Sequence, residues 1–217
     1  MAQEYASSIK GEALRLTTLD ATGAVSTEKY IIQSFVTVSF TPEYEDGEEL
    51  TQKNAAGEVC VSYKMPDVLK RVTLELAVCN PDPELDELLL ANSYLIEDVG
   101  GDSIGFAAPA VGVSTAGNGA SLELWSSAIV DGKPSATYPY WHWLFPLVHL
   151  RPSGTREVGP SIMANTYSGY GIGNKGYGTG VDSAWADFAA PITAGSPYMY
   201  VRTATAPPTS EGIITGV

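Results

Sequence analysis

Residues 58–79 read EVCVSYKMPDVLKRVTLELAVC, and this stretch decides the fold class. Apolar residues recur at every second position on both sides of a Met65-Pro66-Asp67 link. Because successive side chains of a β-strand point to opposite faces, the alternation predicts two strands with one buried and one wet face each. Pro66 fixes its own φ and Asp67 can bond the turn backbone, so the link is predicted to join the two strands as a hairpin.

The residues just upstream predict one more strand and a long loop. Val36, Val38 and Phe40 alternate over residues 34–40 and predict a strand that precedes the hairpin. Residues 42–57 then carry a run of acids around an Asp-Gly pair, which is typical of an exposed turn. We therefore expect a long acidic hairpin loop at 42–57, and its carboxylates are Glu43, Glu45, Asp46, Glu48 and Glu49.

Downstream, residues 80–91 carry the one clear helix start. Asp82 can accept hydrogen bonds from the first free amides, and Pro83 suits the first helical position. Leu85, Leu88 and Leu89 share one face, and the acids Glu84, Asp86 and Glu87 suit the positive end of the helix. We expect one short helix at 82–91 that lies on the sheet.

The remaining chain predicts further strands. Alternating or apolar runs bounded by glycine turns occur at 104–108, 122–130, 136–150, 160–167 and 198–203. We expect an irregular glycine-rich loop at 168–180 and terminal arms at 1–10 and 204–217. Many strands with one helix predict a mainly β (α+β) fold, a β-sandwich or partly closed barrel, formed by 1–217 as a single domain.

Charge limits the partners that this chain can hold. The formal net charge is −13, and residues 1–102 carry 19 acidic and 7 basic residues, a balance of −12. Such a surface repels phosphates, which argues against tightly held DNA or RNA and against an anionic membrane. The most apolar stretch, 138–150, contains Pro139 and Pro146, so we do not expect it to span a bilayer. Cys60 and Cys79 are interpreted as free thiols of a protein made in a reducing cytoplasm.

Three patterns resemble reactive sites, and each lacks the surroundings that its chemistry needs. The glycine pattern of 171–176 has no predicted helix after it to hold a dinucleotide. His142 and His149 have no predicted set of metal ligands, so a buried core or surface histidine is the simpler interpretation. Ser114 lies outside an α/β context, so it is not interpreted as a nucleophile.

A glycosidase would need two paired carboxylates in an aromatic cleft. Aromatic residues are frequent between Tyr138 and Tyr200, but the spacing of Glu123, Asp182 and Asp187 does not pair these acids. We therefore predict no enzyme activity, no catalytic residue, no cofactor and no metal site.

The middle of the chain resembles a known family. The segments that carry the resemblance are KNAAGEVCVSYKMPD at 53–67, LKRVTL at 69–74, CNPDPEL at 79–85, PYWHWLFP at 139–146 and the glycine-rich stretch 169–180. Together they resemble the major tail (tail tube) proteins of long-tailed phages, especially those that infect actinobacteria. The resemblance implies a β-sandwich with a flanking helix, in which six copies form a ring and rings stack into a tube for genome passage.

The same resemblance implies partners and a location. The chain would bind copies of itself and the tape measure, tail terminator and distal tail proteins, and double-stranded DNA would pass without adhering. It would be assembled in the host bacterial cytoplasm and reside in the virion tail, without a membrane partner. The loop at 42–57 and the arms at 1–10 and 204–217 would bridge neighbouring copies.

The acidic charge suggests which residues line such a tube. A wall of carboxylates repels phosphates and releases no counterions, so DNA can slide past it. We expect the wet face of 58–79, with Glu58, Ser62, Thr73 and Glu75, to line the lumen. The acids of the 42–57 loop would then lie at the contact between rings.

Two other kinds of protein stay open. A tail terminator or a secretion-system inner tube protein would share the tube fold without forming the same tube. A carbohydrate-binding β-sandwich would use the tyrosines and tryptophans of residues 138–200 as a sugar platform. A glycosidase ranks below both, because no acid/base pair can be named.

Overall fold

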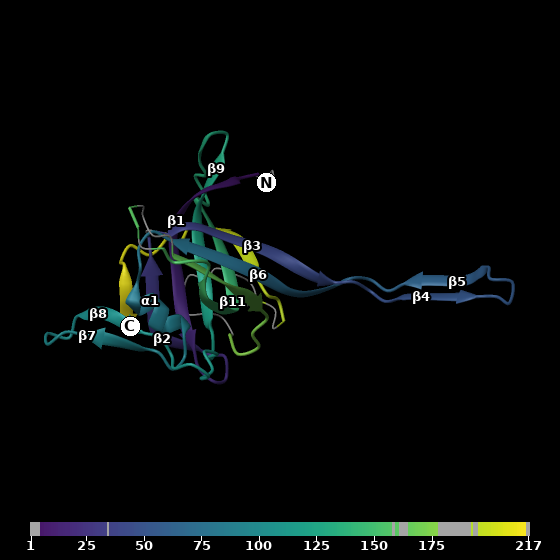
Figure 1. Ribbon diagram of the computed structural model, residues 1–217. Coiled ribbons are helices and arrows are strands. Elements are labelled where there is room, and N and C mark those ends of the chain that lie inside the picture. The colour runs from purple at the N-terminus through teal and green to yellow at the C-terminus, as the bar shows by residue number, and fades with distance from the viewer. Residues whose placement is uncertain are drawn as a thin grey trace.

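The computed structural model describes residues 5–33, 35–157, 159–160, 165–177, 192 and 195–215. Within these residues the fold is mainly β with one short helix, as predicted (Figure 1). The strands of the large sheet are β1 (Ser7–Leu19), β2 (Val25–Ile32), β3 (Phe35–Glu45), β6 (Val68–Val78), β9 (Ala120–Val130), β10 (Lys133–Pro134), β11 (Tyr140–Ser153), β12 (Asn165–Ile172), β13 (Met199–Thr203) and β14 (Gly212–Thr215). Two small sheets pair β4 (Glu49–Lys53) with β5 (Val59–Lys64) and β7 (Tyr94–Glu97) with β8 (Ser103–Ala107).

The large sheet is antiparallel, and among the described residues it is not closed into a barrel. Its order is β14-β2-β1-β9-β11-β12-β6-β3. Strand β11 turns the sheet, because its first half pairs with β9 and β13 whereas its second half pairs with β12. The register shifts between Phe145 and Val148, around Pro146, which cannot donate a ladder hydrogen bond.

The turned sheet encloses one main core. Leu14 and Leu16 of β1 and Leu122 of β9 belong to the same buried cluster as Leu74 and Leu76 of β6. On β6 the apolar residues Val72 to Val78 are buried at every second position, and Thr73 and Glu75 between them are exposed. The predicted half-buried strand is confirmed for β6, but it is wrong for β5, whose six residues are all exposed because no core lies beneath them.

The helix α1 (Pro83–Leu89) begins where the sequence predicts it. The Asp82 carboxylate accepts hydrogen bonds from the amides of Glu84 and Leu85, and Pro83 occupies the first turn. The helix ends two residues before the predicted Ala91. Asp86 has a different role from the one predicted: it is buried, and Arg156 and Tyr167 donate hydrogen bonds to its carboxylate.

The predicted hairpin between residues 58–64 and 69–79 is wrong. Strand β5 pairs with β4, and β6 pairs with β3 and β12, so β5 and β6 follow one another along the same side of one long hairpin. Met65 N donates to Glu48 O across this hairpin at 3.0 Å, and Gly47 N donates to the Asp67 carboxylate at 3.0 Å. The Met65-Pro66-Asp67 link therefore joins two consecutive strands without reversing the chain.

The actual reversal lies at residues 54–57. The Asn54 side chain accepts hydrogen bonds from the amides of Ala56 and Glu58, and Gly57 has a φ of +86°. Such a local side-chain bond and a left-handed glycine are what a tight turn needs. The segment predicted as a loop at 42–57 thus consists of the end of β3, a short link, strand β4 and this turn.

The other sequence predictions have mixed outcomes. Strands at 104–108, 122–130, 136–150 and 198–203 correspond to β8, β9, β11 and β13. Of the strand expected at 160–167, residues 161–164 lie outside the described residues, and Asn165–Ile172 form β12, so part of the predicted 168–180 loop is strand.

The predicted terminal arms are partly strand. Residues 7–10 begin β1, in which Ser7, Ser8 and Ile9 pair with β9, and residues 212–215 form β14, which pairs with β2. Strands β1, β2, β4, β7, β10 and β14 were not predicted. Residues 1–4 and 216–217 lie outside the described residues.

Strands β5 and β6 are consecutive in the chain, but only β6 lies over the core. We therefore expect the truncation of a side chain to affect stability differently in the two strands. Leu74→Ala should lower the free energy of unfolding by about 3 kcal/mol, because Leu74 is 1% exposed and truncation leaves a cavity. The control Val61→Ala on exposed β5 should change it by less than about 0.5 kcal/mol. Urea unfolding followed by tryptophan fluorescence measures both, and equal losses would contradict the division.

Candidate assembly surfaces

Residues 46–67, which we call the arm, project away from the body of the molecule (Figure 1). They contain β4 and β5, which pair only with each other among the described residues. In this register Leu50 lies opposite Tyr63, and Gln52 lies opposite Val61. Leu50, Val59, Val61 and Tyr63 are 46–56% exposed. Because strand side chains alternate, Leu50, Val61 and Tyr63 share one face of the ribbon, together with Gln52. Val59 lies opposite Lys53, beyond a register shift between Gln52 and Lys53, and is not part of this face.

The other face of the arm is polar. Glu49 lies opposite Lys64, and Thr51 lies opposite Ser62. At the tip Asn54 donates a hydrogen bond to the carboxylate of Glu58 at 2.9 Å. The arm is therefore an amphipathic two-stranded ribbon, and such a ribbon is marginally stable by itself in water.

Four of the five acids predicted for the contact between rings stay exposed at the base of the arm: Glu45, Asp46, Glu48 and Glu49. The fifth, Glu43, is bound by Arg71. The guanidinium donates from Nε at 2.5 Å and from Nη2 at 3.2 Å, and this hydrogen bonding lowers the pKa of Glu43. Arg71 also lies over the ring of Tyr170, 5.6 Å from its centroid.

The four lumen candidates are divided between two places. Thr73 and Glu75 lie on the exposed face of β6, whereas Glu58 and Ser62 lie on the arm. In the register of the sheet, Thr73 is opposite Tyr170 of β12, and Glu75 is opposite Ser168. We call this side of β3, β6, β12 and the second half of β11 the polar sheet face.

The polar sheet face carries charges of both signs. His149 and Arg151 of β11 extend the rows of Tyr170 and Ser168 across the sheet. The guanidiniums of Arg71 and Arg151 therefore lie on the same face as the carboxylates of Glu43 and Glu75. A uniformly acidic wall is not found on this part of the chain.

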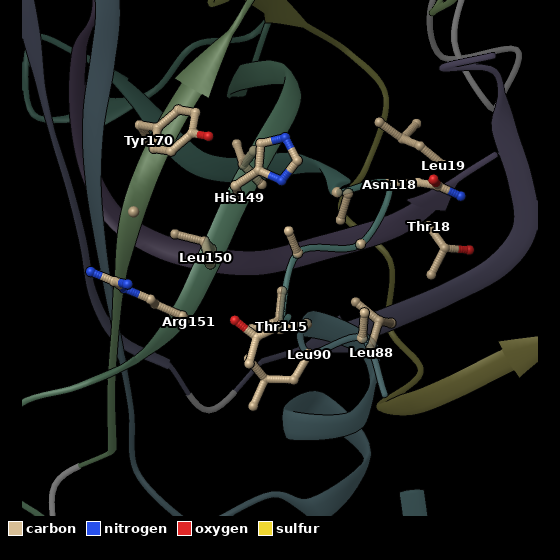
Figure 2. A pocket seen from close by; sticks show the side chains of 18 of the residues that line it. Thr18, Leu19, Leu88, Leu90, Thr115, Asn118, His149, Leu150, Arg151 and Tyr170 are labelled. Carbon is tan, nitrogen blue, oxygen red and sulfur yellow. The ribbon is translucent and has the colours of Figure 1, made fainter. Parts of the chain in front are cut away.

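A cleft of about 720 Å³ lies beside the polar sheet face. Figure 2 shows Tyr170, His149 and Arg151 along one side and Leu88, Leu90 and Thr115 along another. The His149 ring is 5.4 Å from the ring of Tyr170, and partial burial lowers the pKa of His149. The lining combines leucines with hydroxyl and amide groups, and no three metal-binding side chains come together among the described residues.

Side chains of β1, β9 and β11 form a buried charged cluster. Arg15 Nε donates to the Glu123 carboxylate at 2.5 Å, and His142 Nε2 lies 3.3 Å from the other oxygen of the same carboxylate. The His142 ring stacks on Trp125 with centroids 4.1 Å apart. Glu123 and His142 are fully buried, which confirms the interpretation of His142 as a core residue.

Opposing effects act on the Glu123 carboxyl. Burial raises its pKa, but the adjacent His142 ring and Arg15 guanidinium outweigh burial and lower the pKa from 4.5 to about 2. The cluster holds an ionised carboxylate inside the protein. Glu123 is therefore the acidic partner in an internal ion pair with Arg15. The spacing of residues along the sequence does not show this pair, because its contacts join residues of three different strands.

The glycine pattern at 171–176 is a packing loop. Gly171 ends the described pairing of β12 with β6, and the turn at Lys175 and Gly176 follows. Asn174 donates hydrogen bonds to the carbonyls of Gly23 and Pro146, and a Cβ on Gly176 would meet Thr22 O at 2.3 Å. Ser114 is exposed and accepts a hydrogen bond from Ala116 N. Asp182 and Asp187 lie outside the described residues.

The buried carboxylate predicts acid sensitivity. The lowered pKa of Glu123 contributes stability that is complete above about pH 4.5 and lost as the pH falls toward 2. Glu123→Gln should remove this dependence and lower the free energy of unfolding at pH 7 by roughly 3 kcal/mol, since Arg15 loses its charged partner. Urea unfolding at pH 7, 4.5 and 3 measures both effects. Equal losses of stability on acidification in the two proteins would contradict this assignment.

Both cysteines are free and exposed, as predicted. No helix among the described residues is long and apolar enough to cross a membrane. No protein-family model matches the sequence, and no curated protein matches it.

Proposed function

We propose that this chain is the structural subunit of a phage tail tube, in which hexameric rings stack into a hollow tube for the passage of viral DNA. Its partners are copies of itself and, at the ends and centre of the tail, the terminator, distal tail and tape measure proteins. Its location is the virion tail, after assembly in the bacterial cytoplasm. No enzymatic step is part of the proposal.

The arm carries this proposal. Its apolar face, which contains Leu50, Val61 and Tyr63, has no cover among the described residues of its own chain. A protein that works alone gains nothing from a projecting apolar ribbon, which is an aggregation risk. A subunit gains a contact with the next copy. The segment 53–67, which holds the turn and β5, is also part of the resemblance to tail tube proteins.

The charge distribution supports passage of DNA without binding. The net charge of −13 repels phosphates, and Arg71 of the polar sheet face is bound to the Glu43 carboxylate. Strong binding to DNA needs several unpaired cations that release counterions. We retain Thr73 and Glu75 as lumen candidates and place Glu58 and Ser62 with the arm.

A carbohydrate-binding β-sandwich is the second candidate, because one observation favours it. Trp143 stacks on Tyr200 with centroids 4.8 Å apart, and Trp141 lies 5.8 Å from the same ring. Tyr200 and Tyr138 are 50% and 43% exposed, so an aromatic surface reaches solvent. Aromatic surfaces of this composition also serve protein interfaces. A tail terminator or secretion-system inner tube protein is the alternative within the tube fold.

Electron microscopy of the purified protein tests self-assembly. Concentrated wild-type protein should form rings and long tubes, whereas Val61→Glu should not, because a carboxylate on the apolar face would be buried without a partner. Ser62→Glu is the matched control: it adds the same charge on the adjacent residue but on the polar face, and it should still assemble.

Three results would change the proposal. Single rings without tubes would favour a terminator. A monomer at every concentration that binds a saccharide saturably would favour the carbohydrate-binding candidate. Equal assembly by Val61→Glu and wild-type protein would remove the arm from the argument.

A further inference from the structure

Strand β3 separates from β1 at a corner of the sheet. Strand β2 pairs with β1 only from Leu19 to Leu14, and β3 then continues the chain but pairs with β6. Among the described residues, β1 before Leu14 therefore has β9 on one side and no strand on the other. The outer edge of β3 likewise has no strand partner there.

A groove of about 280 Å³ lies between these two unpaired edges. We call it the β1–β3 groove, and its lining is Ser8–Gly11, Phe35–Val38, Phe40, Leu124, Ser126 and Trp143. Ile9 and Val36 at its rim are 53% and 64% exposed. Beyond Trp143 the apolar surface continues through Tyr200 to Trp141. Tryptophan and tyrosine are enriched at the energetic centres of protein interfaces.

The backbone at this groove is irregular. Lys10 has a left-handed φ of +56°, and the register of β1 shifts on both sides of Gly11. A Cβ on Gly11 would lie 2.2 Å from the tip of the Phe35 ring, so a side chain there would displace this ring where β3 leaves β1. Strained residues that persist in a fold are concentrated at functional sites.

We infer that the β1–β3 groove is the surface that receives the apolar face of the arm from a second copy of this chain. This inference rests on the proposed function, because it names the partner surface of the same self-assembly. Leu50, Val61 and Tyr63 would lie on Phe40, Leu124 and Trp143. The unpaired edge of β3 offers backbone groups to an added strand, which is a common way to bind an extended segment.

Charge favours this surface over two others. Lys10, which is paired with Glu12 at 2.9 Å, is the only charged residue in the groove lining, whereas Glu45, Asp46, Glu48 and Glu49 surround the base of the arm. An arm that lay against a second arm would bring these acidic bases together. An arm that lay on the polar sheet face would meet Glu43 and Glu75, although Arg71 and Arg151 lie on the same face. The groove lining adds no carboxylate of its own.

The contact between one arm and one groove is small, as expected for a contact that many copies repeat. The two arm strands and their turn span residues 49–64, fewer than the 20–30 residues that a typical stable interface uses on each side. One arm in one groove is therefore a weak contact. Since arm and groove are different surfaces, the contact is heterologous, and successive copies extend it into a ring or filament.

Cross-linking between single-cysteine proteins tests the inference. In a Cys60→Ser, Cys79→Ser background, one protein carries Val61→Cys on the arm and another carries Val36→Cys in the groove. Mixed and oxidised, they should form a disulfide-linked heterodimer in larger amount than either homodimer. Ser62→Cys on the polar face replaces Val61→Cys as the control and should cross-link to Val36→Cys several-fold less.

The outcomes separate this inference from the proposed function. Tubes in the same samples with no excess of heterodimer would overturn the groove assignment and leave the tube subunit intact, and a dominant Val61→Cys homodimer would indicate arm-to-arm contact. Heterodimers without rings or tubes would support the groove and overturn the tube. If neither forms at any concentration, both are wrong.

A charged substitution gives an independent measurement. Val36→Glu should abolish assembly by electron microscopy while the monomer keeps its unfolding midpoint, because Val36 is exposed. Val99→Glu, at an exposed position of the β7–β8 turn, is the control and should assemble as wild type. Assembly of Val36→Glu at the wild-type level would overturn the groove assignment.

Discussion

The burial of one face of β6 is the contact on which the rest of the structure depends. Val72, Leu74, Leu76 and Val78 lie in the main core against leucines of β1 and β9. The same strand continues through Met65-Pro66-Asp67 into β5, which has no core beneath it. The buried half of the ribbon therefore anchors the exposed half. An apolar face can project into solvent here because its other end is held in a close-packed interior.

The fold class could be read from the sequence, but the pairing of strands could not. Alternation gives the orientation of each side chain relative to its own strand, and it was correct for β6. It does not say which strand lies beside it. Pro66 and Asp67 are common in turns, yet both also suit a link between consecutive strands, and Asn54 and Gly57 form the actual reversal. Alternation over Val61 and Tyr63 likewise reports one apolar face without saying what covers it.

Strand β1 and the buried cluster show a second limit of sequence patterns. In β1 both faces are buried from Ala13 to Thr17, so Arg15 and Thr17 interrupt the apolar run without being exposed. A charge is ordinarily evidence for the wet face of a strand. Only the three-strand register shows that Arg15 lies directly opposite Glu123 and that His142 completes the pair. Such a contact depends on tertiary pairing, which local spacing does not encode.

The balance between repulsion and contact determines when copies of this chain can meet. A net charge of −13 keeps separate copies apart, and the acids are concentrated at the base of the arm, beside the surface proposed for assembly. Repulsion between exposed charges extends over a Debye length of about 8 Å at physiological salt, whereas apolar burial acts only at contact. A single weak contact does not overcome this repulsion, but contacts repeated around a ring act together. The same acids that oppose random pairing therefore favour assembly only where several copies are already held in place.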